Sequence, residues 1–131
     1  MAEKCLCEPD EIVLLPCSGG SNCGQLANAA AVKLTQDKVG RIFCLAGIGG
    51  HVSGMKASTK SAKRIVAIDG CSVACAKKTL EHAGLEPTDY IVVAELGIEK
   101  NHDFDLPESH VSRVISAVKD SLAVVELPAA D

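Results

Sequence analysis

The segment that decides the fold is residues 11–24, EIVLLPCSGGSNCG, in which a short apolar run passes directly into Gly, Ser and Asn residues. An apolar run of this length is typical of a buried strand, and the residues after it are typical of a turn. Residues 63–75, KRIVAIDGCSVAC, follow the same order, with an apolar run that leads into a glycine and two cysteines. In both segments we predict a strand that is followed by a turn and then by a helix.

The chain around these two segments continues the alternation of strands and helices. The spacing of Leu26, Ala30 and Leu34 predicts a helix that is capped by Asn22 and ends near Gly40. Further strands are predicted at residues 41–46 and 89–96, a weak helix or loop at 53–61, and helices at 73–83 and from Asp105 onward.

Alternating strands and helices predict a parallel sheet that is covered on both faces, with right-handed crossovers. We therefore predict an α/β fold, a small three-layer sandwich with a four-stranded, mainly parallel sheet. The strand order 2-1-3-4 is expected by analogy with other small doubly wound folds of the flavodoxin-like and Rossmann-like type. The length of 131 residues suits one domain. We assign that domain to residues 11–131 and a flexible tail to residues 1–10, with an edge strand or frayed end at 123–131.

The composition narrows the possible partners. The chain is 47% apolar but has no Trp, two Phe and one Tyr, so its core must be built from aliphatic side chains. A net charge of −4 gives no basic surplus for nucleic acid. No apolar run approaches the ~20 residues that span a bilayer, and the N-terminus lacks the apolar core of a secretion signal. We therefore predict a cytoplasmic protein without a nucleic-acid or membrane partner. The sequence indicates neither a protein partner nor a small-molecule substrate.

Seven cysteines are many for a chain of this length. In a reducing compartment they favour metal ligands, catalytic thiols or buried side chains over disulfides. In the order 2-1-3-4 the first and third strands are neighbours, and their carboxyl ends meet at one edge of the sheet. The turns after them carry Cys17 with Cys23 and Cys71 with Cys75. Cys71 and Cys75 would share one face if both lay in the first turn of a helix. We therefore expect four thiols to face one crevice.

Four thiolates suit Zn²⁺, which binds sulfur at ~2.3 Å in a tetrahedral arrangement. Several buried cysteines would be the alternative, but four at the mouths of two adjacent turns favour a metal or redox site. Three further residues are possible additions to the site. Cys44, inside a predicted strand, is more typical of a core residue, and His51 is more typical of a loop residue. Asp69 is expected to accept hydrogen bonds from the turn after it or to orient a ligand.

The motifs CSGGSNC at 17–23, GIGGH at 47–51 and DGCSVAC at 69–75 resemble those of the DGC-domain family, which is expected to bind zinc. The family takes its name from an Asp-Gly-Cys motif, and the resemblance extends from about Ile12 to the last helix. It implies four chelating cysteines, which fall on Cys17, Cys23, Cys71 and Cys75. It implies no reaction. Cys5 and Cys7 fall outside the pattern, in the predicted tail.

Two alternatives use the same thiols. The first is a redox or sulfur-transfer enzyme with Cys17 as nucleophile and a second cysteine that resolves it. Residues 12–24 also resemble the phosphate loop of small cysteine phosphatases and arsenate reductases, but Cys23 stands where those proteins have Arg. The missing guanidinium argues against phosphate chemistry. The second alternative is an iron–sulfur cluster, because four cysteines hold either metal centre. Whether the protein is an enzyme is left open.

Overall fold

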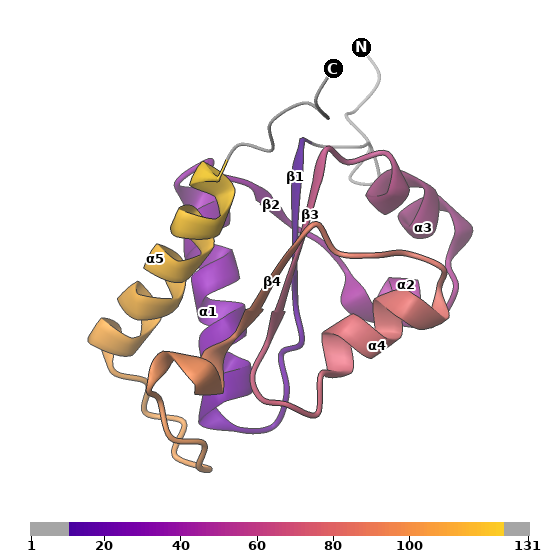
Figure 1. Ribbon diagram of the computed structural model, residues 1–131. Helices are drawn as coiled ribbons and strands as arrows, with labels where there is room; N and C mark the ends of the chain where they lie inside the picture. The colour runs from indigo at the N-terminus through magenta and orange to yellow at the C-terminus, as the bar shows by residue number, and fades with distance from the viewer. Residues whose placement is uncertain (1–10, 125–131) are drawn as a thin grey trace.

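The computed structural model describes residues 11–124, which form an α/β fold (Figure 1). The strands are β1 (Ile12–Pro16), β2 (Arg41–Ile42), β3 (Arg64–Asp69) and β4 (Asp89–Val92). The helices are α1 (Asn22–Gln36), α2 (Leu45–Gly49), α3 (Ser53–Lys60), α4 (Cys75–His82), the 3-10 helix η1 (Val93–Leu96) and α5 (Glu108–Ala123). The predicted tail at 1–10, with Cys5 and Cys7, and residues 125–131 lie outside the described residues. Within 11–124 no helix is long and apolar enough to cross a membrane.

The four strands form an all-parallel sheet in the order β2-β1-β3-β4, which confirms the predicted fold class and strand order. β1 pairs with β3 along its whole length, from Ile12 against Arg64 to Pro16 against Ile68. These two central strands are the point at which the strand order reverses. Their carboxyl ends therefore deliver the two cysteine-bearing turns to one place, where open α/β sheets bind ligands.

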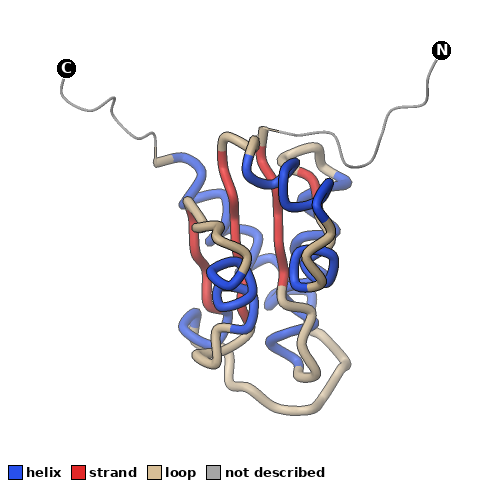
Figure 2. The backbone as a smooth tube through the Cα atoms, turned by 90° about the vertical axis from the view of Figure 1, so that its right-hand side faces the viewer, coloured by secondary structure: helices blue, strands red, loops and turns tan. Residues whose placement is uncertain are grey.

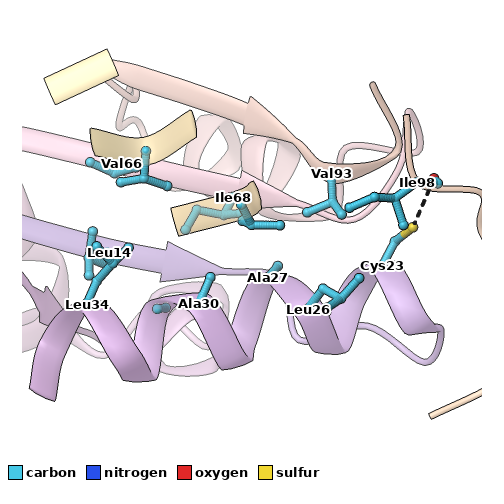
Figure 3. Close-up of a cluster of buried hydrophobic side chains, with 13 residues drawn as sticks. Leu14, Cys23, Leu26, Ala27, Ala30, Leu34, Val66, Ile68, Val93 and Ile98 are labelled. Atoms are coloured by element: carbon cyan, nitrogen blue, oxygen red, sulfur yellow. Dashed lines mark hydrogen bonds between the residues drawn. The ribbon is translucent and has the colours of Figure 1, made fainter. Parts of the chain in front are cut away.

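Helices cover both faces of the sheet, as Figures 1 and 2 show. Alternate residues of a strand point to opposite faces, so Leu14 and Ile68 belong to the core beneath α1 and α5, whereas Leu15 and Ala67 belong to the core beneath α2 and α4. Figure 3 shows the first of these cores, in which small residues of α1 lie directly against the sheet. The chain thus fills both layers with aliphatic side chains, as its composition predicts.

The amino end of the sheet is fixed by a buried carboxylate. Asp89 binds the Arg64 guanidinium through both oxygens, at 2.9 and 2.7 Å, and accepts hydrogen bonds from the hydroxyls of Ser121 and Thr88 at 2.6 Å each. Burial alone would raise the pKa of Asp89, but these hydrogen bonds outweigh it and hold the pKa below its usual value. The cluster joins β3, β4 and α5 at the end of the molecule opposite the cysteine turns.

The predicted strand at 41–46 is confirmed only at residues 41–42 and is wrong at residues 43–46. β2 contains two residues, and Cys44, predicted inside the strand, is instead the exposed residue that precedes α2. β2 is an edge strand that pairs only with β1 among the strands described, so little holds it extended. Gly47 lies so close to the Met55 sulfur that a Cβ there would collide with it. This contact between distant residues, which no short window of sequence reveals, accompanies the start of α2 at residues 45–46, where a strand was predicted.

Other boundaries also shift. β4 ends at Val92 and the chain continues as η1, and α4 begins at Cys75 because Ala74 adopts a left-handed conformation with φ 60°. α5 begins at Glu108 rather than Asp105. Before it, the backbone N–H of Asp103 donates to the Asn101 side chain, and that of Asp105 donates to Asp103. Such side-chain turns compete with a helix, and Pro107 disfavours helical backbone in the residue before it.

Candidate thiol site

Cys17 follows β1 and continues its pairing with β3. Its backbone N–H donates to the Ile68 carbonyl at 2.9 Å, and its sulfur accepts a hydrogen bond from the Gly70 N–H at 3.3 Å. The half-buried thiol therefore lies directly against the Asp-Gly-Cys turn. Burial raises the pKa of Cys17, and the backbone N–H groups of Gly19 and Gly70 offset this effect only in part.

Glycines allow three backbone segments to meet beside this thiol. A Cβ on Gly70 would lie 2.7 Å from the Gly24 nitrogen, in the first turn of α1. A Cβ on Gly24 would lie 2.5 Å from the Gly19 oxygen. Both contacts are with backbone, which cannot rotate away as a side chain can. The glycine of the Asp-Gly-Cys motif is therefore required by close packing of the two cysteine turns.

Asp69 organises the second turn. Its carboxylate is 1% exposed and accepts hydrogen bonds from the backbone N–H groups of Ala76 at 2.7 Å and Lys77 at 3.1 Å. The Tyr90 hydroxyl donates to the same carboxylate at 2.8 Å, and burial followed by this bond raises the tyrosine pKa. Asp69 thus caps α4 and ties it to β4. The sequence predicted that Asp69 accepts hydrogen bonds from the turn after it. The backbone donors instead lie a few residues later, in the first turn of α4.

Three cysteines line one pocket of about 210 Å³, namely Cys17, Cys71 and Cys75. Cys71 precedes α4 and Cys75 is its first residue, so the two do not both lie in the first helical turn, which was the condition for a shared face. Lys100 and His102 line the same pocket from the segment between η1 and α5, and the Lys100 ammonium donates to the Cys71 sulfur at 3.4 Å. Sequence reasoning missed both residues.

Asn22 brings that segment to the pocket. Its side chain donates to the Glu99 carbonyl at 2.8 Å and accepts from the Asn101 N–H at 2.6 Å, and its own N–H donates to the Asn101 carbonyl at 3.0 Å. The prediction that Asn22 caps α1 is therefore wrong. Ser21 takes that role, because its hydroxyl accepts a hydrogen bond from the Gly24 N–H at 3.1 Å.

Cys23 does not line the pocket. It is fully buried in the core beneath α1, where its thiol donates to the Ile98 carbonyl at 3.7 Å (Figure 3). Burial, and next the negative charge of Cys71, raise the pKa of Cys23. The structure thus brings three of the four predicted thiols to one pocket and turns the fourth inward. Among residues 11–124, no three His, Cys, Asp or Glu side chains are arranged to hold a metal ion.

Of the possible additions to the site, Cys44 and His51 lie in different places. Cys44 lines a second pocket, of about 540 Å³, whose wall also includes Cys17 and Cys75. His51 lies on the surface, where its ring nitrogen is 3.2 Å from a ring nitrogen of His82, and it lines neither of these two pockets. Cys44 therefore joins the thiol region, whereas His51 does not.

Comparison with known proteins agrees with the motifs around this pocket. The profile of the DGC domain matches residues 13–118. The chain belongs to the DGC-domain family. It is also similar to the anaerobic and virulence modulator AnvM of Pseudomonas aeruginosa, with 34% identity over 98 residues, which is 75% of each chain. No solved structure gives a significant match.

Proposed function

We propose that this DGC-domain protein binds a zinc ion through the thiolates of Cys17, Cys71 and Cys75, with Cys23 as the fourth ligand. The observation that supports this most is that three cysteines from two adjacent strand-to-helix turns line one pocket. Soft thiolate donors match the preference of zinc, and four such ligands make a closed structural site. The metal would supply a cross-link between the two turns.

Cys23 is the least prepared of the four ligands. Its thiol must give up the contact with the Ile98 carbonyl, which at 3.7 Å is weak and costs little to lose. Cys71 and Cys17 are both near enough to influence its ionisation. Lys100 is within 3.4 Å of the Cys71 sulfur and is suited to balance the negative charge of a site built from thiolates.

The raised pKa values of Cys17 and Cys23 bear on the choice between ligand and nucleophile. A catalytic thiol is activated by a lowered pKa, whereas burial moves Cys17 in the opposite direction. A zinc ligand tolerates a raised thiol pKa, since the metal displaces the proton and binding weakens as the pH falls. This comparison favours a metal ligand over the redox or sulfur-transfer alternative.

A modulator role belongs to the same proposal. The Pseudomonas relative is named as a modulator, and a small domain whose metal fixes the shape of two turns can serve in that way without a reaction of its own. We also propose a cytoplasmic location, because reduced thiols persist in a reducing compartment.

The experiment is a metal analysis of the protein as purified under reducing conditions, by plasma mass spectrometry. We expect about one zinc per chain, as for a single four-ligand site. Cys→Ser variants at Cys17, Cys23, Cys71 and Cys75 should each lose it, whereas Cys44→Ser, at an exposed cysteine, is the matched control and should keep it. Bound iron together with visible absorbance would favour the iron–sulfur cluster over zinc. Absence of any metal would overturn the proposal.

A further inference from the structure

The second pocket carries one thiol, that of Cys44, that the zinc proposal does not use. It shares Cys17 and Cys75 with the first pocket and adds Cys44. Cys44 and Cys75 are the two exposed cysteines among residues 11–124, whereas the other three are half-buried or buried. Of the five cysteines that the structure describes, a reagent from solution therefore meets this pair first.

The packing of α2 against α4 places the two cysteines opposite each other. The helices lie side by side (Figure 1), and a Cβ on Gly49 would lie 3.3 Å from the Thr79 methyl group. At the carboxyl end of α4 and just beyond that of α2, a ring nitrogen of His82 lies 3.2 Å from a ring nitrogen of His51. The residues in these two contacts are 30 and 31 positions apart in the sequence. Because the offset stays nearly constant along both helices, α2 and α4 run in the same direction. Cys44 and Cys75, at the amino ends of the two helices, are also 31 positions apart.

We propose that Cys44 and Cys75 are a thiol–disulfide exchange site for small organic disulfides, and that the disulfide they form withdraws Cys75 from the zinc site. The first half of this inference rests on the geometry of the second pocket alone. The second half rests on the proposed function.

Two exchange steps balance the chemistry. The Cys44 thiolate attacks one sulfur of the small disulfide, which breaks its S–S bond and releases one thiolate. The Cys75 thiolate then attacks the Cys44 sulfur of the mixed disulfide and releases the second thiolate. The two cysteines lose two electrons, the small disulfide gains them, and the two protein thiol protons end on the two released thiols. Cys75 in the disulfide would no longer be available as a ligand of the proposed zinc ion.

The two helices differ in how firmly they are held. α4 is anchored by the Asp69 carboxylate, which accepts hydrogen bonds from its first turn. α2 has five residues, two of them glycine, and the Cys44 side chain makes no capping hydrogen bond to it. Glycine weakens a helix, so α2 can shift to bring the two sulfurs into bonding range. Apolar side chains beside Cys44, those of Phe43 and Leu45, offer a surface to the organic part of the disulfide.

The test treats the full-length protein with oxidised glutathione and digests it with trypsin without reduction. Cys44 falls in peptide 42–56, and Cys71 and Cys75 fall in peptide 65–77. We expect these peptides to be joined, with fragmentation that assigns the bond to Cys75. A chromogenic chelator measures zinc release in the same samples. The wild type should lose its zinc, and Cys44→Ser should keep it and form no joined peptide.

Three results would overturn the inference: a bond to Cys71, a mixed disulfide on Cys44 that does not proceed to a bond with Cys75, or zinc release from Cys44→Ser at the wild-type rate. Protein purified without zinc would defeat the proposed function and, with it, the release of metal. The joined peptides would still decide whether Cys44 and Cys75 are an exchanging pair, because that readout needs no metal.

Discussion

The two cysteine turns hold their thiols in different ways. In the turn after β1, backbone N–H groups contact the Cys17 sulfur and Ser21 caps the helix that follows. In the turn after β3, the buried carboxylate of Asp69 accepts hydrogen bonds from backbone N–H groups in the first turn of α4 and from the Tyr90 hydroxyl. The first turn is therefore fixed by a backbone hydrogen bond to its thiol and by a serine hydroxyl, whereas the second depends on one carboxylate. Substitutions should separate the two.

Asp69→Ala should have the largest effect. It leaves the Ala76 N–H and the Tyr90 hydroxyl without their acceptor, and unsatisfied buried groups cost about 1–3 kcal/mol each. We expect a loss of about 3 kcal/mol in the free energy of unfolding, measured by urea denaturation of the metal-free protein. Asp69→Asn keeps one acceptor oxygen and should lose less. Equal losses in the two variants would contradict the role of the carboxylate.

Gly70→Ala should follow, because its Cβ would lie 2.7 Å from backbone of the first turn of α1. Overpacking of this kind costs about 2 kcal/mol. The added methyl group should also push the two cysteine turns apart, which should reduce the zinc content measured in the metal analysis. The matched control is Gly20→Ala, since nothing lies within 4 Å of a Cβ at that position. A Gly20→Ala protein as unstable as Gly70→Ala would show that the two turns do not pack as described.

Ser21→Ala tests the first turn with a smaller effect. Loss of the hydrogen bond from the Gly24 N–H to the serine hydroxyl should cost about 1 kcal/mol, as for other helix caps. The change in urea midpoint should be clearly smaller than for Asp69→Ala. Ser21→Thr retains a hydroxyl and should recover most of the stability. A Ser21→Ala loss as large as that of Asp69→Ala would remove the contrast between the two turns.

The smallest expected effect is a pH dependence of the metal-free protein. The folded-state pKa of Cys17 is raised from its ordinary value of 9.0, so the unfolded chain ionises this thiol at lower pH than the folded chain. The unfolded state then binds fewer protons, and stability is kept below pH 9.0 and falls as the pH rises through the folded pKa. Cys17→Ser should reduce this fall in thermal melts under reducing conditions. An unchanged slope would contradict the burial of the thiol.

The sequence predicted well what short-range pattern controls. The apolar runs at 11–16 and 63–69 form the central strands, and three of the four thiols expected after them line one pocket. The sequence-based predictions failed where contacts between residues far apart in the chain determine the local structure. Lys100 reaches the pocket only because Asn22 binds the segment beside it, and Gly47 against Met55 accompanies α2 in place of a strand. The burial of Cys23 beside Ile98, 75 residues further along the chain, is likewise a contact that no short window of sequence reveals.

The hydroxyl of Tyr90 has a practical consequence. The chain has one tyrosine and no tryptophan, so its intrinsic ultraviolet emission comes from a single ring. That ring donates its hydrogen bond to Asp69 and lies under the Lys77 ammonium, 5.0 Å from the ring centre. A carboxylate acceptor quenches tyrosine fluorescence, so loosening of the second turn brightens the protein. The molecule thus carries an unlabelled optical reporter at the side chain on which the position of α4 depends.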